Sequence, residues 1–220
     1  MTAPTLLVGD VGGTNARFAT VHLVDGTPVL DRIESFPAKR FPTLLAGVAA
    51  FIDGCKDRPS GGVIAVAGPV TDGQIDLTNS PWRVSEPELA TLGLDPVRLI
   101  NDFEAQAWGA SIMPPDQLAS LGGPRAGAAN ATLAVIGPGT GFGVSALIHD
   151  GDGRQIAMPS EGGHVSFAPN DPVEDAVLRI LRRRYGRVSI ERLLSGPGLL
   201  NLHQALAEID GRESGIEDPA

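Results

Sequence analysis

A short apolar segment, a glycine-rich turn and a second apolar segment follow one another twice in this chain, and this repetition constrains the fold more than any other feature. The first copy spans about residues 5–24 and contains the turn Gly9–Asn15. The second spans about residues 131–148 and contains the turn Gly137–Gly141. Apolar runs that end in glycine turns are typical of strands in a hairpin. We interpret the pair as a coarse internal repeat, so the sequence predicts two half-structures that each carry one glycine turn.

The segments between the two copies alternate between strand and helix signals. Turns at Gly12-Gly13 and Asp25-Gly26 predict an antiparallel strand meander that continues to Phe36. Thr43 precedes an apolar run with helical spacing, and Ser85 and Glu88 have the spacing of a capping box. Further strands are expected over residues 62–70, 75–77 and 98–100, and further helices over residues 103–112, 174–185 and 199–209. The order of these elements is typical of an α/β protein.

Composition and charge exclude several classes of function. The chain has 17 basic and 26 acidic residues and a formal net charge of −9, which repels nucleic acids and anionic membranes. We therefore expect no nucleic-acid or membrane partner, whereas ATP stays compatible because backbone amides and Mg²⁺ hold phosphates locally. No apolar run reaches membrane-spanning length, no leader is recognised, and the single Cys55 allows no internal disulfide. These features predict a cytoplasmic protein in which Cys55 is a small buried residue at a helix end.

The two glycine turns are candidate phosphate-binding sites. Glycines let backbone amides approach phosphate oxygens, because a Cβ atom would collide with them. In the first turn Thr14 and Asn15 add side-chain donors, and Asp10 is placed to hold Mg²⁺ through water. Thr140 adds a donor to the second turn. Neither turn is a Walker A loop, since no Gly-Lys-Ser/Thr follows. For either turn alone, a hairpin that needs positive φ explains the glycines equally well.

Two polar clusters are candidates for the reacting groups. Asn101 and Asp102 follow an expected strand and begin a helix, where a carboxylate could accept a proton from a hydroxyl, or could only cap the helix. Glu161 and His164 lie in a loop bounded by prolines and glycines, and suit hydrogen bonds to a polyol better than a metal. Glu191, at the head of a helix near Ser189-Ile190, could instead act on the helix dipole. A further candidate, with a turn-forming alternative, is Asn79.

Five segments of the chain resemble bacterial glucokinases of the hexokinase-like, actin-fold superfamily. In order along the chain, these segments are GDVGGTNARFA, LINDFEAQAW, IGPGTGFGVS, PSEGGHVSFAP and ERLLSGPGLLNLH. The resemblance implies an α/β, ribonuclease-H-like (actin-like ATPase) sugar kinase fold, with two domains that close on the sugar. We place the small domain at residues 1–112, with the first phosphate turn and the catalytic Asp. The partial large domain then spans residues 113–220, with the second phosphate turn and the sugar ligands.

The resemblance also implies roles for single residues. Asp102 corresponds to the general base for the sugar 6-hydroxyl. The substrate-binding set that it implies is Asn79, Asn101, Asp102, Glu161, His164 and Glu191. The phosphate-binding set is Gly9, Asp10, Val11, Gly12, Gly13, Thr14, Asn15, Gly137, Gly139, Thr140 and Gly141, with Asp10 for Mg²⁺. Members of the family phosphorylate glucose with ATP at the start of glycolysis, and the resemblance suggests a homodimer.

The family's chains continue past the position of Ala220, so the sequence resembles a C-terminally truncated member whose second domain is incomplete. The family's adenosine-binding segment lies in that further part. Three hypotheses follow from the residues and the resemblance. The first is an ATP-dependent glucokinase. The others are a sugar-binding or regulatory module with impaired catalysis, and a kinase for a different hexose.

Overall fold

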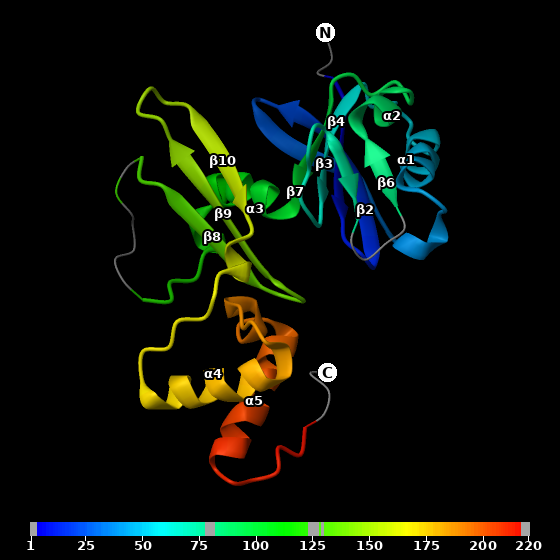
Figure 1. Cartoon of the computed structure of the whole chain (residues 1–220). Helices are drawn as coiled ribbons and strands as arrows, with labels where there is room; N and C mark the ends of the chain where they lie inside the picture. Colours follow the sequence, from blue (N-terminus) through cyan, green and yellow to red (C-terminus); the bar gives the residue numbers. More distant parts are fainter. Residues whose placement is uncertain (1–3, 78–81, 123–127, 129, 217–220) are drawn as a thin grey trace. The chain divides into compact units, whose positions relative to one another are not determined.

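The computed structural model describes residues 4–77, 82–122, 128 and 130–216 (Figure 1). The chain divides into two compact units, Met1–Ala105 and Gln106–Ala220. Each unit is built on its own sheet. The domain boundary expected after residue 112 from the sequence stays a prediction.

The first unit contains a five-stranded sheet in the order β3-β2-β1-β4-β7. Its strands are β1 (Leu6–Val11), β2 (Asn15–Val24), β3 (Thr27–Pro37), β4 (Gly61–Val66) and β7 (Val97–Asn101). The pairs β1/β2 and β2/β3 are antiparallel, whereas β1, β4 and β7 run parallel to one another. The sheet therefore combines the expected meander with a parallel half, and the parallel half brings the carboxyl ends of three strands to one edge.

Two turns explain where the strands of this sheet stop. Asp25 and Gly26 have φ values of 50° and 79°, which is the left-handed pair that a two-residue hairpin between twisted strands requires. The strand expected over residues 62–70 ends earlier, at Val66. Beyond it, the Ala67 amide donates to the Val11 carbonyl, and Gly68 has a φ of 146° that breaks the extended backbone. The meander is thus confirmed, and the β4 strand is shorter than predicted.

Capping residues fix the helices of the first unit. Helix α1 (Leu44–Asp53) begins after Thr43, whose side chain accepts the Ala46 amide. Helix α2 (Glu86–Ala90) begins with the predicted capping box, in which the side chains of Ser85 and Glu88 each accept from the other's backbone amide. The remaining elements that begin in this unit are β5 (Gln74–Asp76), β6 (Arg83–Ser85), the 3-10 turn Ala38–Arg40 and α3 (Asp102–Ile112).

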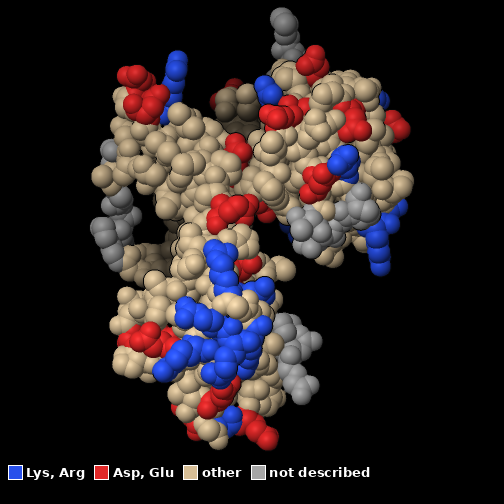
Figure 2. Space-filling model, viewed as in Figure 1, with Lys and Arg blue, Asp and Glu red and all other residues tan. Residues whose placement is uncertain are grey.

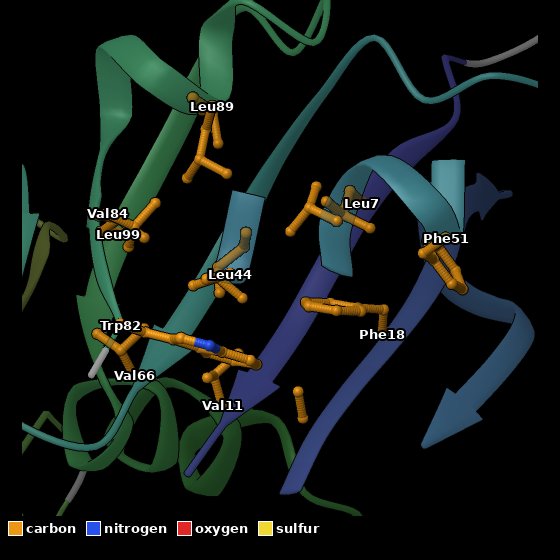
Figure 3. Close-up of a cluster of buried hydrophobic side chains, with 14 of the residues drawn as sticks. Leu7, Val11, Phe18, Leu44, Phe51, Val66, Trp82, Val84, Leu89 and Leu99 are labelled. Atoms are coloured by element: carbon orange, nitrogen blue, oxygen red, sulfur yellow. The ribbon is translucent and has the colours of Figure 1, made fainter. Parts of the chain in front are cut away.

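The core of the first unit forms where α1 packs on the sheet. Figure 3 shows Leu44 and Phe51 of α1 beside Leu7 and Phe18 of the sheet, and all four side chains are at most 1% exposed. The Phe18 ring lies 5.4 Å from the ring of Phe36 and 5.7 Å from that of Phe51, within the range of favourable aromatic contacts. Phe18 of this cluster packs closely against Gly9, the first residue of the glycine turn.

The second unit contains a three-stranded antiparallel sheet in the order β10-β9-β8. Its strands are β8 (Leu133–Pro138), β9 (Phe142–His149) and β10 (Gln155–Ser160). The hairpin β8/β9 confirms the second copy of the strand–turn–strand pattern. Strand β10 was not predicted, because its residues QIAMPS lack a regular apolar alternation. In the structure these residues are mostly exposed.

Helices α4 (Pro172–Tyr185) and α5 (Gly196–Ile209) pack side by side in the second unit (Figure 1). Asp171 and Ser195 cap their first turns. The other elements are 3-10 turns at Pro115–Gln117, Gly162–His164 and Ile190–Arg192. The small core that these helices share consists of Val177, Ile180, Leu181, Val188, Leu193 and Ala205.

Basic side chains gather over α4 and α5 in the space-filling view (Figure 2). Arg182, Arg183 and Arg184 occupy the last turn of α4, where cations interact favourably with the helix dipole. Arg183 pairs with Glu208 at 2.5 Å, and Arg184 donates to the Gln204 side chain. The basic end of α4 is therefore tied to α5.

Two further sequence-based expectations concern burial and membranes. The Cys55 thiol is partly buried after α1 and donates to the Phe51 carbonyl at 3.3 Å, and burial raises its pKa. In the ranges that the structure describes, no helix is both long and apolar enough to cross a membrane.

Candidate active site

The carboxyl ends of β1, β4 and β7 bring the first acidic candidates to one edge of the sheet. The strand register pairs Val11 with Val66 and Val66 with Asn101. Asp10 and the Asn101-Asp102 pair therefore lie at the same edge, although the sequence separates them widely. In open α/β sheets this edge is where ligands bind.

Asn101 and Asp102 form a fixed pair at the start of α3. The Asn101 Nδ2 atom donates to the Gly68 carbonyl at 3.1 Å and to Asp102 Oδ1 at 3.0 Å. Its Oδ1 accepts the amides of Phe103 and Glu104, and the Phe103 amide also donates to Asp102 Oδ1 at 3.0 Å. The cap that the sequence offered as an alternative is therefore real, and Asn101 supplies most of it. The same contacts orient the half-buried Asp102 carboxylate.

The pKa of Asp102 lies above its usual range, chiefly because burial removes water from the carboxylate. The negative charge of Asp10 raises it further, while hydrogen bonds from Phe103 and Asn101 act in the opposite direction. A raised carboxyl pKa suits a general base that must take up a proton near neutral pH. The raised pKa also means that the folded state holds the Asp102 proton more tightly than the unfolded state does. The resulting stabilisation is therefore fully present at low pH, below the unfolded-state pKa, and is lost as the pH rises through the folded-state pKa.

We predict that Asp10→Asn lowers the pKa of Asp102, because the substitution removes a like charge that disfavours the second carboxylate. NMR titration of the Asp102 side-chain carbon measures this shift without any assay of activity. Asp25→Asn, in the exposed hairpin turn, is the matched control and should leave the titration curve in place. An identical curve for wild type and Asp10→Asn would contradict the coupling of the two carboxylates.

The first glycine turn is held by backbone hydrogen bonds. The Gly12 amide donates to the Asn15 carbonyl at 2.9 Å, and the Thr14 carbonyl accepts the Ala38 amide at 2.8 Å. Gly9 is required for close packing, since a Cβ atom there would lie 3.0 Å from side-chain atoms of both Phe18 and Ile64. Of the candidate phosphate ligands in this turn, Val11 is buried in the core, so only its backbone is available to a ligand.

Asp10 is the candidate for Mg²⁺, and its surroundings fit a weakly held ion. Its carboxylate is 63% exposed and lies 3.6 Å from the Arg17 guanidinium, which is its direct partner across the β1/β2 pair. No group of three or more His, Cys, Asp and Glu side chains forms a metal cage within the described residues. One exposed carboxylate suits Mg²⁺ that keeps most of its waters and arrives with substrate phosphates.

The second unit brings three sugar-ligand candidates together. His164 Nε2 lies 3.6 Å from Glu161 Oε2, and His164 Nδ1 lies 3.9 Å from Glu191 Oε1. Both distances exceed those of good hydrogen bonds, so the three side chains are near one another without being bonded. The side chains of Glu161 and His164 are 64% and 55% exposed, and that of Glu191 is 28% exposed. This cluster presents two acceptors and one imidazole to a ligand.

The backbone holds this cluster in place. The loop that carries Glu161 and His164 runs beside the segment that leads to Glu191, because the Ile190 amide donates to the Val165 carbonyl and the Phe167 amide to the Val188 carbonyl, both at 3.0 Å. The Arg187 side chain donates to the His164 carbonyl. Gly163 permits the close approach of the loop to β9, since a Cβ atom there would collide with the Phe142 carbonyl at 1.9 Å.

The second glycine turn lies beside the same cluster. The Gly139 amide donates to the Gly141 carbonyl, and the Gly139 carbonyl accepts the Gly196 amide at the start of α5, both at 2.8 Å. Glu191 Oε2 accepts the Phe142 amide at 2.9 Å. The prediction of a helix that begins near Ser189-Ile190 was wrong, because only the 3-10 turn Ile190–Arg192 forms there and α5 begins at Gly196. The Glu191 carboxylate faces the glycine turn instead of heading a helix. Thr140 is exposed, as a ligand of a bound phosphate would be.

With this geometry in view, known proteins show where the chain belongs. The sequence profile described as Glucokinase matches residues 7–220. The chain belongs to the glucokinase family. It is 42% identical over 225 residues to the glucokinase of Xylella fastidiosa (strain 9a5c), with 98% of this chain and 66% of that protein covered. The chain thus spans about two thirds of the length of the curated relatives that it matches.

Solved glucokinases share the fold of this family member. A glucokinase from an Antarctic psychrotroph superposes with a TM-score of 0.86 at 32% identity, over 97% of this chain and 67% of that one. A ROK family glucokinase from Streptomyces griseus, solved in complex with glucose and AMPPNP, gives a TM-score of 0.56 at 20% identity, over 94% of this chain and 62% of that one. The actin-like ATPase fold expected from the sequence is thereby confirmed.

Several groups beside the candidate residues of each unit were not predicted from the sequence. Arg17 faces Asp10, and the register of the predicted hairpin could have revealed it. The Phe142 amide and the Arg187 side chain left no sequence signal, because their partners come from distant segments. The candidate Asn79 lies outside the described residues, so its role stays a prediction.

Proposed function

We propose that this chain transfers the γ-phosphoryl group of ATP to the 6-hydroxyl of glucose, with Asp102 as the general base. The observation that carries the proposal is the Asn101-Asp102 pair: a half-buried carboxylate, oriented by two hydrogen bonds to Oδ1, at the ligand-binding edge of the sheet. Membership of the glucokinase family supports the choice of glucose and ATP as substrates.

The proposed step requires little covalent chemistry from the protein. Phosphoryl transfer depends mainly on positioning the acceptor and stabilising charge on the transferred group. In this proposal Asp102 accepts the proton of the 6-hydroxyl while that oxygen attacks the γ-phosphorus and ADP leaves. Asn101 keeps the carboxylate oriented, because its amide bridges Asp102 and the Gly68 carbonyl.

The two glycine turns and Asp10 are proposed to serve the phosphates. Backbone amides such as that of Gly13 would donate to phosphate oxygens, with Thr14 and Thr140 beside them, whereas the Gly12 and Gly139 amides already donate within their turns and shape them. Mg²⁺, when bound, neutralises charge on the phosphates, and Asp10 would hold it through water. The exposed Asp10 carboxylate supports such a loosely held ion.

Glu161, His164 and Glu191 are proposed to hold the sugar hydroxyls. Substitution of Glu161 by Gln or of His164 by Asn should weaken glucose binding by about tenfold to a hundredfold, because Gln lacks the charge that strengthens the hydrogen bond and Asn lacks the reach of the imidazole. Isothermal titration calorimetry with glucose measures the Kd, and a coupled assay measures kcat and KM. We expect KM to rise more than kcat falls.

Two variants in the same unit serve as matched controls for the sugar site. Glu208→Gln and His203→Asn make the same chemical changes on α5, away from the cluster. Both should bind glucose like the wild-type chain. Unchanged glucose affinity in Glu161→Gln and His164→Asn would refute the sugar-ligand assignment, and glucose binding without turnover would favour a sugar-binding module over a kinase.

Location and assembly belong to the same proposal. We also propose a cytoplasmic location, where ATP and glucose would both be available to a sugar kinase. The family resemblance also leads us to propose a homodimer. Sedimentation equilibrium of the purified chain tests the dimer directly.

A further inference from the structure

The two carboxylate oxygens of Glu191 have different surroundings. Oε2 accepts the Phe142 amide at 2.9 Å, at the point where the second glycine turn enters β9. Oε1 faces His164 at 3.9 Å, too far for a hydrogen bond. One oxygen is therefore used within the protein, and the other is available to a ligand.

The rest of the turn is anchored to the segment that carries Glu191. The Gly196 amide donates to the Gly139 carbonyl, and the Ser195 hydroxyl donates to the Glu191 carbonyl, both at 2.8 Å. Glu191 thus lies between the N-terminus of α5 and the turn. The Glu191 side chain contacts one end of the turn at Phe142, whereas Gly196 contacts the turn at Gly139.

The fit between Glu191 and the turn is tight. A Cβ atom at Gly141 would lie 2.6 Å from Glu191 Oε2 and 3.5 Å from its Cδ. The glycine at this position therefore makes room for the carboxylate, in addition to any room that it gives a phosphate. At Gly139, in the same turn, a Cβ atom would meet nothing within 4 Å. Only one of the two glycines is required by the carboxylate.

We propose that Glu191 is a positioning residue that holds the second glycine turn in its ligand-ready form, in addition to its proposed contact with the sugar. The inference rests on the proposed function, in which this turn binds phosphate. The Glu191 carboxylate contacts the turn through Oε2 and faces the sugar cluster through Oε1. A sugar hydroxyl that donates to Oε1 therefore changes the negative charge on Oε2, the oxygen that accepts the Phe142 amide. Sugar binding and turn geometry are then linked, and by thermodynamic reciprocity each affects the other.

Amide hydrogen exchange at Phe142, followed by NMR, tests the positioning role. Glu191→Ala removes the acceptor and should speed exchange about tenfold or more. Gly141→Ala should do the same by displacing the carboxylate, although it leaves Glu191 itself intact. Glu191→Gln should restore slow exchange, because its amide oxygen still accepts. Gly109→Ala, where the new methyl meets nothing within 4 Å, is the control.

Ligand titrations separate positioning from a general loss of structure. Mg²⁺-tripolyphosphate probes the phosphate turns without requiring an adenosine pocket. Gly141→Ala should weaken its binding more than it weakens glucose binding, whereas Glu191→Gln should weaken glucose binding more. Equal loss of both affinities in both variants would indicate a merely structural role and overturn the proposal.

Failure of the inference and failure of the proposed function give different results. Phe142 exchange in Glu191→Ala within twofold of wild type would overturn the positioning role, whatever the chain binds. A wild-type chain that binds no glucose would overturn the proposed function and the sugar linkage. Slow Phe142 exchange that depends on Glu191 would still support the positioning of the turn in that case.

Discussion

Replacing Asp102 by Asn should reduce kcat by about a hundredfold to ten-thousandfold, the usual contribution of a positioned general base. The asparagine side chain is nearly isosteric, and its oxygen can still accept the Phe103 amide that Asp102 Oδ1 accepts now. The start of α3 should therefore stay intact while the proton acceptor is lost. Glucose binding should survive in part, so kcat falls much more than KM rises.

Glu104 provides the control for the competing interpretation, in which Asp102 is only a helix-capping charge. Both residues lie in the first turn of α3, where a negative charge interacts favourably with the helix dipole. Glu104→Gln removes such a charge without removing the proposed base, and should leave kcat within about twofold, as expected of a dipole contact alone. Turnover of Asp102→Asn within tenfold of wild type would contradict the base assignment. Circular dichroism of both variants checks that α3 still forms.

Local signals predicted the elements of this fold well where one short segment contains both the signal and its partner. Thr43 caps α1 and Ser85 pairs with Glu88, as their spacing indicates, because capping bonds join residues three positions apart. The turn at Asp25-Gly26 gives its hairpin for the same reason. Strand β10 was missed because its pairing with β9, and not its own apolar pattern, makes it a strand.

The candidate site could be predicted only as residue types, since its geometry depends on long-range contacts. The sequence offered base and helix cap as alternatives for Asp102, whereas the structure gives most of the capping to Asn101. For Glu191 it offered a sugar ligand or a dipole charge, and no local pattern indicates that the carboxylate accepts the Phe142 amide, 49 positions away. Such contacts follow from the packing of distant segments, which periodicity and spacing do not encode.

Phe18→Ala should cost about 3–5 kcal/mol of the free energy of unfolding, because it removes a fully buried aromatic ring and leaves a cavity. Phe18 is 1% exposed and contacts the rings of Phe36 and Phe51. Since small proteins are stable by only about 5–15 kcal/mol, the loss is a large fraction of the total. The melting temperature of the 220-residue chain should fall by roughly 6–20 °C. Leu23→Ala on the same strand, at a side chain that is 55% exposed, should change stability by no more than about 0.5 kcal/mol.

Phe18→Ala should also loosen the first glycine turn, which links the loss of stability to the proposed function. Gly9 packs so closely on Phe18 that a Cβ atom would lie 3.0 Å from the ring, so removal of the ring takes away the base under the turn. Amide exchange over residues 9–15 should therefore speed up in Phe18→Ala under conditions where the chain is still folded. Leu23→Ala should leave exchange in the turn unchanged. A turn that stays equally protected above the cavity would show that its backbone bonds, such as Gly12 to Asn15, hold it without support from the core.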